Sequence, residues 1–334
     1  MSRIKWGILS TANIGIKRVI PAILNGERGT IVAIASRDFD KAKSVAARFG
    51  IPRSYGGYEA LLQDPEVEAI YNPLPNHLHV EWTVRALEAG KHVLCEKPIG
   101  LNAQEAQSIV SARNRTGRSV IEAFMVRHHP QWHRVRELVQ QGRIGTVRLI
   151  QSAFLFPMLD PHNVRNHPEM GGGALYDVGC YPIVTARYLF ATEPLRAIAL
   201  LERDPHSGVD RLSSGLVDFG DRGHLVFSSS FQLAPYQHVV ILGSAGRIEI
   251  RIPFTPQKDQ ICRLGIDSGK SLDGSSMVFE EIAAVDQYAL QCDQAAAVFR
   301  GEATQEFPIE DAIANMRVLD ALYQSARSGH WETP

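Results

Sequence analysis

Two segments of this chain carry side chains suited to acid–base chemistry. Lys97 lies in Cys-Glu-Lys-Pro at residues 95–98, and Asp177 and Tyr181 follow three consecutive glycines at residues 171–173. A tyrosine with an unperturbed pKa of about 10 is a poor acid or base at neutral pH, but a nearby ammonium stabilises the phenolate and lowers that pKa. Lys97 is the candidate for that charge. The alternative is that Tyr181 is a half-buried core aromatic and that Asp177 only complements a helix dipole.

The residues around these side chains indicate how they are presented. Pro98 restricts Lys97 to an extended conformation, so the lysine projects from a stiff turn. The three glycines predict close backbone packing at the start of a helix, beside something bulky. On that helix Asp177 and Tyr181 are four positions apart and therefore share a face.

A short segment near the amino terminus has features of a dinucleotide-binding turn. Residues 4–9 are typical of a buried strand, and Ser-Thr-Ala-Asn-Ile-Gly over residues 10–15 leads into a helix, where a Rossmann fold carries G-x-G-x-x-G. Ser10 and Ala12 replace the first two glycines, and Gly15 remains. Ala12 still lets backbone approach a pyrophosphate, and the helix start offers N–H groups and positive dipole. An ordinary turn between strand and helix is the alternative.

The end of the second predicted strand favours NADP over NAD. An acidic residue at this place normally binds the ribose of NAD, whereas this chain has Ser36 followed by Arg37. An arginine can hold a 2′-phosphate by charge-assisted hydrogen bonds. Asp38 leaves NAD binding open, and a solvated Arg37 at a strand end is the other alternative.

These segments belong to a repeating strand–helix pattern. The apolar runs of the first third are continuous, which indicates strands that are buried on both faces of a parallel sheet, and such sheets bind ligands at the carboxyl ends of their strands. We therefore expect a doubly wound α/β Rossmann domain over residues 1–123. Its strands are predicted at residues 4–9, 31–35, 69–71, 92–95 and 119–123, and its helices at 14–24, 41–49, 79–89 and 103–114.

The pattern changes after about residue 147. Period-two runs predict antiparallel strands, so we expect an α+β domain over residues 124–334 that binds substrate. Strands are predicted at residues 147–156, 198–202, 215–219, 224–231 and 247–252, and helices at 174–189, 286–299 and 309–325. The polar loop 158–169, which includes Arg165, offers many hydrogen-bond partners and is a candidate for substrate specificity.

Composition excludes several classes of protein. A length of 334 residues is typical of about two domains, and a net charge of −1 gives no global field that would attract nucleic acid or an acidic membrane. No apolar window approaches the length of about 18 residues that a membrane span needs, and the amino terminus does not resemble a signal sequence. The four cysteines form no C-x-x-C pair, which favours a reducing compartment. We expect a cytoplasmic protein with a small-molecule partner.

The histidines raise the question of a metal site. His129 and His133 form an i, i+4 pair beside His128, but no matched acidic or cysteine ligand accompanies them. We expect no metal.

The motifs occur in the order found in the Gfo/Idh/MocA family of oxidoreductases, which the chain resembles over essentially its whole length. The resemblance rests on the dinucleotide turn, on Glu96-Lys97-Pro98 and on the glycine run that leads to Asp177 and Tyr181. Further matching stretches are Ser36-Arg37, residues 122–125, Arg127 and Pro130-Gln131. The resemblance implies a Rossmann domain followed by a domain with a large, mostly antiparallel sheet, whose open face commonly forms a dimer.

The resemblance also implies roles for individual residues. Lys97 looks like the lysine of the family's EKP motif, which orients substrate and assists proton transfer, and its bond to Pro98 is expected to be cis. Tyr181 resembles the proton carrier of the branch with dihydrodiol dehydrogenase, NADP-dependent xylose dehydrogenase and glucose–fructose oxidoreductase, and Asp177 a substrate-side hydrogen-bond partner. Cofactor contacts are expected at Ser10, Thr11, Ala12, Asn13, Ile14, Ser36, Arg37, Pro73, Leu74, Asn76, His79, Glu96 and Lys97.

The expected function is NADP-dependent hydride transfer, with NAD less favoured, between the nicotinamide and a carbinol or carbonyl carbon of a sugar, polyol or diol. The expected partners are a small polyhydroxylated substrate and further copies of the chain, as a homodimer or a dimer of dimers. One alternative is an enzyme that keeps its cofactor bound and recycles it within one active site. The other is a non-catalytic NADP-sensing regulator, although a sensor has no need of Lys97, Asp177 and Tyr181 together.

Overall fold

The computed structural model describes residues 3–334, which divide into two compact units. The first unit contains the residues up to Met125 together with Asp286–Ile313, and the second contains Val126–Val285 and Ala314–Pro334. A single boundary near residue 123 does not describe this division, because residues 286–313 return to pack in the first unit. Two elements, η3 (Met125–His128) and α9 (Ile309–Ser328), each begin in the first unit and end in the second.

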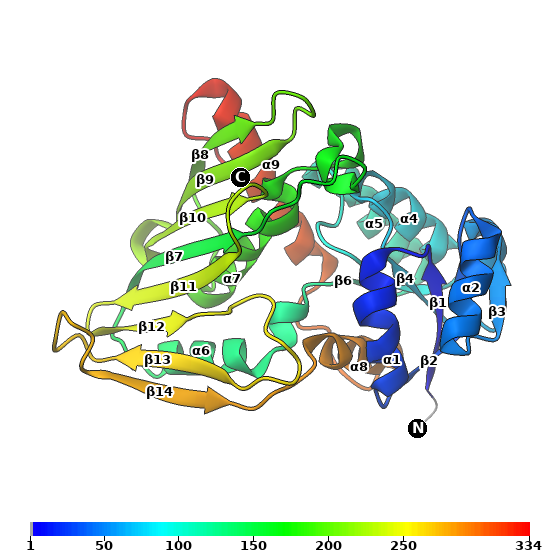
Figure 1. Ribbon diagram of the computed structural model, residues 1–334, viewed down its shortest axis with the longest axis horizontal. Coiled ribbons are helices and arrows are strands. Elements are labelled where there is room, and N and C mark those ends of the chain that lie inside the picture. Colours follow the sequence, from blue (N-terminus) through cyan, green and yellow to red (C-terminus); the bar gives the residue numbers. More distant parts are fainter. Residues whose placement is uncertain (1–2) are drawn as a thin grey trace. The chain divides into compact units, whose positions relative to one another are not determined.

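The first unit is built on a parallel sheet. Its described strands form one six-stranded sheet in the order β3-β2-β1-β4-β5-β6, with parallel pairing throughout, which is the strand order of a Rossmann fold (Figure 1). The strands are β1 (Ile4–Leu9), β2 (Gly29–Ala35), β3 (Arg53–Tyr55), β4 (Ala69–Asn72), β5 (His92–Cys95) and β6 (Val120–Glu122). The helical elements are η1 (Gly15–Val19), α1 (Ile20–Asn25), α2 (Phe39–Phe49), α3 (Tyr58–Leu62), η2 (Asn76–Leu78), α4 (His79–Glu88), α5 (Ala103–Thr116) and α8 (Gln287–Phe299).

Local sequence explains where these helices begin and end. The Asp38 side chain accepts a hydrogen bond from Lys41 N–H at the start of α2, and Asn102 does the same for Glu105 N–H at the start of α5. Both helices end on a glycine with positive φ, Gly50 and Gly117, a conformation that a side chain disfavours. The helix predicted over residues 41–49 therefore ends as expected, and the one predicted over residues 103–114 runs on to Thr116.

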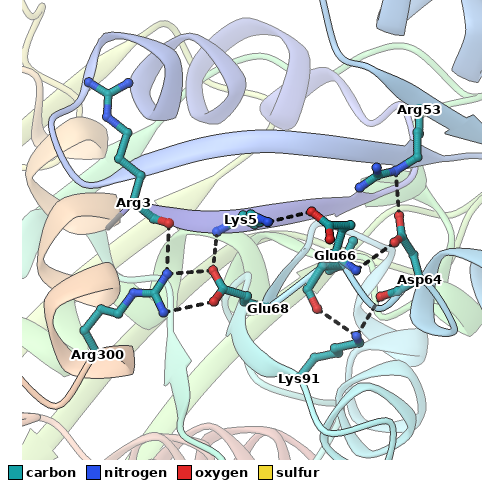
Figure 2. Close-up of polar contacts among 9 residues, drawn as sticks. Arg3, Lys5, Arg53, Asp64, Glu66, Glu68, Lys91 and Arg300 are labelled. Atoms are coloured by element: carbon teal, nitrogen blue, oxygen red, sulfur yellow. Dashed lines mark hydrogen bonds and ion pairs between the residues drawn. The ribbon is translucent and has the colours of Figure 1, made fainter. Parts of the chain in front are cut away.

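Residues 286–313 contact the first unit's sheet at the amino-terminal ends of its strands. Arg300, just after α8, forms paired hydrogen bonds with the carboxylate of Glu68 and also donates to the carbonyl of Arg3, as Figure 2 shows. Glu68 in turn accepts from the backbone N–H of Lys5 in β1. The ring of Phe299 packs on Trp6, with centroids 5.7 Å apart. Residues 286–313 are therefore part of the core of the first unit.

A buried lysine closes the loop that leads into β4. The Nζ of Lys91 donates to the carbonyls of Asp64 and Val67 at 2.8 and 2.7 Å (Figure 2). Arg53 lies 2.8 Å from the Asp64 carboxylate, which also accepts from the hydroxyl of Tyr55. Apart from Tyr55, the last residue of β3, these residues lie at or before the amino ends of their strands, so the contacts stabilise the edge of the sheet opposite to its carboxyl edge.

The second unit is built on a mostly antiparallel sheet. Its described strands form one eight-stranded sheet in the order β14-β13-β12-β11-β7-β10-β9-β8, in which only the β7–β10 pair is parallel (Figure 1). The strands are β7 (Val147–Leu155), β8 (Arg196–Arg203), β9 (Asp210–Asp218), β10 (His224–Ser230), β11 (Tyr236–Gly243), β12 (Gly246–Ile250), β13 (Cys262–Asp267) and β14 (Met277–Ile282). The helical elements are α6 (Pro130–Gln140), η4 (Val164–Asn166), η5 (Pro168–Met170), η6 (Leu175–Gly179), α7 (Cys180–Phe190) and η7 (Gly220–Arg222).

The two faces of this sheet differ. On one face η6 and α7 pack against β7 and β10, so Phe154 of β7 touches the ring of Tyr181 and Phe227 of β10 lies against Gly179. The opposite face exposes apolar residues in the middle strands, including Val226, which is 42% exposed. The outer edge of β8 is paired at Ala197 with Glu332, near the carboxyl terminus. Among the described residues no helix is long and apolar enough to cross a membrane.

Candidate functional site

The turn after β1 keeps the backbone shape of a dinucleotide turn without its first glycines. Ser10 adopts a positive φ of 69°, a conformation that glycine adopts easily, and its hydroxyl accepts from Ala12 N–H. Helical bonding begins at once, because Ile16 N–H donates to the carbonyl of Ala12. Ile14, at the N-cap position of η1, offers no side chain that could cap this helix end. The N–H groups of this first turn are therefore suited to a pyrophosphate, and the residues present fit a dinucleotide.

The strand end after β2 separates Arg37 from Asp38. The Asp38 carboxylate caps α2 and pairs with the ammonium of Lys41 at 3.2 Å, and both contacts lower the pKa of Asp38. Arg37 is exposed and interacts with the hydroxyl of Tyr58: burial raises the pKa of that hydroxyl, and the guanidinium opposes the rise. Asp38 is thus engaged within its own helix, and Ser36 and Arg37 are its neighbours at this strand end.

The loop after β4 is held by Asn72, which is fully buried. Its Nδ2 donates to the carbonyl of His79 and to the hydroxyl of Thr83, both at 3.2 Å, and its Oδ1 accepts from Leu74 N–H. Pro73, Leu74 and Asn76 therefore lie on a loop that the side-chain amide of Asn72 holds both at its start and at the helix α4 that follows it.

His79 joins this loop to the one after β5. Its Nε2 lies 2.6 Å from the carbonyl of Leu74 and its Nδ1 lies 2.7 Å from the carbonyl of Pro98. Burial lowers the pKa of His79 to about 4, helped by the charges of Lys97 and His77 and opposed by the two carbonyls. The ring is 1% exposed. The neutral His79 ring carries a single N–H, so it donates to one of these two carbonyls and lies in contact with the other, between the two loops.

Glu96 and Lys97 follow β5 at the same edge. The Tyr71 hydroxyl donates to Glu96 Oε1 at 2.6 Å, and burial together with the Glu96 charge raises the pKa of that hydroxyl well above its usual value. Lys97 is half-buried, and its bond to Pro98 is cis, which confirms the expectation. The next residue, Ile99, donates its N–H to Glu122 Oε1. The lysine therefore stands on a turn that is held on both sides.

The predicted cofactor residues thus gather at one edge of the first unit. They follow the carboxyl ends of four parallel strands, β1, β2, β4 and β5, where open α/β sheets bind ligands. Asp177 and Tyr181 belong to the second unit.

In the second unit the glycine run is required by close packing. A Cβ on Gly172 would lie 2.5 Å from the carbonyl oxygen of Arg165, and one on Gly173 would lie 2.2 Å from Asp210 Oδ1. The expected bulky neighbours are therefore a loop backbone and a carboxylate. The helix that follows opens with the π-helical turn η6, as the first unit's helix opens with η1, and π-helical turns are frequent at functional sites.

Asp177 and Tyr181 lie in different surroundings on that helix. The Asp177 side chain is 15% exposed and accepts from Nε of Arg165 at 2.6 Å. Tyr181 is 4% exposed, and its ring packs on Phe154 and Phe254 with centroids 5.5 and 5.4 Å apart. The aromatic body of Tyr181 is thus a core residue.

Two of the three neighbouring histidines make local structural contacts. The His129 side chain accepts from Gln131 N–H at the start of α6, and His133 Nε2 lies 2.7 Å from the carbonyl of Arg127. Burial lowers the pKa of His128 to about 4. No group of three or more metal-ligating side chains occurs among the residues that the structure describes.

Sequence reasoning overlooked the residues that hold the site together. Tyr71, Asn72, Asp210 and Tyr323 do not stand in a recognisable motif, and each acts on a segment other than its own. Arg165 was expected only as one of several polar residues of a loop, and its pairing with Asp177 needs the folded chain.

Two family models match the chain. The oxidoreductase family with an NAD-binding Rossmann fold matches residues 4–124, and the GFO/IDH/MocA C-terminal domain matches residues 132–249. The two matches agree with the parallel sheet of the first unit and with most of the sheet of the second.

Known proteins resemble the chain over its full length. An uncharacterized oxidoreductase, ORF334, of Rhizobium meliloti is 45% identical over 100% of both chains. D-xylose 1-dehydrogenase (NADP(+)) 2 of Haloferax volcanii is 37% identical, over 97% of this chain and 98% of its own. The crystal structure of KijD10, a 3-ketoreductase from Actinomadura kijaniata in complex with NADP and TDP-benzene, matches with a TM-score of 0.91 and 29% identity, over 97% and 98% of the two chains.

The expected resemblance is therefore confirmed, and this chain belongs to the Gfo/Idh/MocA family of oxidoreductases.

Proposed function

We propose that this protein is an NADP-dependent oxidoreductase that interconverts a carbinol and a carbonyl carbon in a sugar, polyol or diol. The observation that carries this proposal is the fixed placement of Glu96 and Lys97 at the carboxyl edge of the parallel sheet. Tyr71 donates a hydrogen bond to Glu96, and the ring of His79 lies between the Leu74 and Pro98 carbonyls of the loops after β4 and β5. A turn with only a structural role has no need of such support for a half-buried lysine.

NADP is the cofactor that the strand end after β2 suits best. Ser36 and Arg37 would hold the 2′-phosphate, and the capping role of Asp38 removes the nearest acidic side chain that would bind the free ribose of NAD. The turn of residues 10–14 would hold the pyrophosphate. The xylose dehydrogenase relative, which is named as NADP-dependent, and the NADP complex of KijD10 support the same choice.

The nicotinamide side would be held by the loops after β4 and β5. Pro73, Leu74, Asn76 and Glu96 lie on these loops, and His79 acts on them through the Leu74 and Pro98 carbonyls. When bound there, the cofactor would supply hydride transfer.

Tyr181 and Lys97 would handle the proton. We assign Tyr181 Oη to take the hydroxyl proton from the carbinol, or to return it to the carbonyl oxygen, and Lys97 Nζ to stabilise the resulting anion. Asp177, oriented by Arg165, would accept a hydrogen bond from a substrate hydroxyl. Proton transfer of this kind contributes roughly 10²–10⁴-fold to the rate.

The substrate class follows from polar groups and from relatives. A carboxylate and a polar loop suit a ligand rich in hydroxyls, and two of the similar proteins named above are a D-xylose dehydrogenase and a 3-ketoreductase. The second unit is therefore proposed as the substrate domain.

We also propose a homodimer through the open face of the eight-stranded sheet. The strand register aligns Ile198, Leu216, Val226, Gln151 and Val240 in one row across five strands. Four of these five side chains are apolar, and all five are at least partly exposed. An exposed apolar row in the middle of a sheet is typical of a surface that another chain covers.

A spectrophotometric screen tests the function. Aldoses, polyols and diols are offered with NADP and with NAD in parallel, and ketoses and aldehydes with the reduced cofactors. Turnover with NADP on at least one substrate, with steady release of NADPH, is expected. Binding of NADPH without turnover on any substrate would instead support the regulator.

A further inference from the structure

A buried carboxylate in the second unit reaches the amino end of the helix that carries Asp177 and Tyr181. Asp210 is the first residue of β9 and is 1% exposed. Its Oδ2 accepts a hydrogen bond from the backbone N–H of Leu175 at 2.7 Å. Leu175 begins η6, so Asp210 satisfies one of the N–H groups that a helix start leaves without an internal partner.

The helix does not provide this cap from its own sequence. Three glycines and Ala174 precede Leu175, and among the described residues no side chain caps the start of η6 in the usual N-cap position. Most helices obtain that contact from an adjacent Ser, Thr, Asp or Asn. Here it comes from a strand 35 residues later in the chain. The first turn of the helix is therefore fixed to the sheet.

The carboxylate is itself held in place by two hydroxyls. Ser213 Oγ donates to Oδ2 of Asp210 at 2.8 Å, and Tyr323 Oη of α9 donates to Oδ1 at 2.9 Å. The Tyr323 ring also packs on Tyr176, the residue before Asp177, with centroids 4.7 Å apart. Asp210 thus joins three elements, β9, α9 and η6.

Gly173 completes the arrangement from the loop side. Its φ is 121°, and a Cβ at this position would lie 2.2 Å from Asp210 Oδ1 and 3.4 Å from the Tyr323 hydroxyl. Only a residue without a side chain lets the loop backbone approach the carboxylate this closely. Asp210 can therefore lie this close to the loop backbone because position 173 is a glycine.

From this geometry we infer that Asp210 is a positioning residue, which sets the orientation of the first turns of η6 and α7 and thereby the places of Asp177 and Tyr181. The inference rests on the function proposed above for those two residues. Asp177 lies two positions after the capped Leu175, so a displaced first turn moves its carboxylate first. We expect substrate binding to respond more than cofactor binding.

Three variants of the full-length protein test this role. Tyr323→Phe removes one hydroxyl that holds Asp210 but keeps the ring on Tyr176, and Asp210→Asn removes the charge at nearly constant shape. Asp218→Asn is the matched control: Asp218 is a buried carboxylate at the other end of β9, where it accepts from Arg196 and from Gly220 N–H. Tyr323→Phe keeps the test decisive if Asp210→Asn does not fold.

The first measurement is hydrogen–deuterium exchange without cofactor or substrate. We expect faster exchange over residues 174–181 in Tyr323→Phe and Asp210→Asn, and wild-type exchange there in Asp218→Asn. Residues 12–25 of the first unit should exchange as in wild type in all three. Unchanged exchange over residues 174–181 in both test variants would overturn the inference.

The second measurement separates positioning from mere stability. With the best substrate of the screen, we expect kcat/KM of the test variants to fall about ten- to hundredfold, mainly through KM, because small misplacements of binding groups have effects of this size. The dissociation constant of NADPH should stay within twofold of wild type, on the order of experimental precision. Test variants with faster exchange but the kinetics of Asp218→Asn would show a purely structural Asp210 and overturn the inference. If the wild type has no turnover on any substrate, the proposed function fails, and exchange alone decides whether Asp210 fixes the helix.

Discussion

Asp177 and Arg165 are joined by a hydrogen bond of 2.6 Å from Nε to Oδ2. The same arginine accepts Gly173 N–H on its carbonyl, so it holds both the side chain and the start of the helix. Arg165 therefore joins the polar loop to η6 through two hydrogen bonds, one to the Asp177 side chain and one to the backbone just before the helix.

Replacing Arg165 by Met should weaken substrate binding. The Asp177 carboxylate loses a charge-assisted hydrogen bond, a contact that is worth about 1.5–3 kcal/mol, and no longer has a fixed orientation. We expect KM to rise by about tenfold or more, with a smaller change in kcat. Arg211→Met, which removes the ion pairs of Arg211 with Glu202 and Asp204 in the same unit, is the control in steady-state assays. Equal KM values in the two variants would contradict the role of Arg165.

Tyr181→Phe should abolish turnover and leave NADPH binding intact. The phenylalanine ring keeps the contacts with Phe154 and Phe254, so only the hydroxyl is lost. We expect kcat to fall by roughly 10²–10⁴-fold, the usual contribution of a proton carrier. Fluorescence titration with NADPH and thermal melting check that binding and folding are preserved. A variant that keeps most of its rate would refute the assignment.

Arg37→Ala should reduce the preference for NADP. Loss of the charged hydrogen bonds to a 2′-phosphate is expected to raise the dissociation constant of NADPH about ten- to hundredfold and to change that of NADH little. The control is Asp38→Ala, which removes the cap of α2 and should leave the ratio of the two constants unchanged. Calorimetric titrations with both cofactors measure the ratio. If Asp38→Ala weakens NADH binding selectively, Asp38 binds the ribose.

The ion pair between Arg300 and Glu68 should make stability depend on pH. Burial raises the pKa of Glu68, but the Arg300 and Lys5 N–H hydrogen bonds outweigh it, and the net shift is downward. A carboxylate with a lowered pKa stabilises the folded state above its ordinary pKa, and this contribution is lost as the pH falls through the folded-state value. Glu68→Gln should lower the free energy of unfolding by up to about 1 kcal/mol near neutral pH, because the pair is partly exposed.

The difference between wild type and Glu68→Gln should shrink as the pH becomes acidic. Thermal melts from neutral to acidic pH measure it. Glu88→Gln, which removes an exposed pair with Arg115, is the control. A difference that stays constant across the pH range would mean that the carboxylate charge is not what stabilises this edge.

Val226→Glu should convert a dimer into monomers. Val226 lies in the middle of the exposed apolar row, so a charge there would be desolvated in the interface. Size-exclusion chromatography with light scattering measures the mass. Lys258→Glu, outside that row, is the control. A monomeric wild type would contradict the proposed interface.

Much of the fold follows from local pattern. The parallel sheet, its helix ends at Gly50 and Gly117 and the turn at residues 10–15 each depend on interactions within a few residues, which periodicity and turn chemistry report. Strand β3 did not follow from the sequence, because Arg-Ser-Tyr is neither an apolar run nor an alternating one. Strands β11, β13 and β14 were also not expected.

The sequence by itself therefore determined the family, the edge of the sheet where the cofactor residues gather, and the candidate pair Asp177 and Tyr181. Only the tertiary structure decided what holds them: Asp210 caps a helix 35 residues away, Tyr323 holds Asp210 from a distance of 113 residues, and Arg300 reaches Glu68 across 232. The physical reason is that a hydrogen bond depends on separation in space, and a pattern read along the chain records only neighbours in sequence. The role of Asp38 shows the same point at short range, since its carboxylate becomes a helix cap only once α2 has formed.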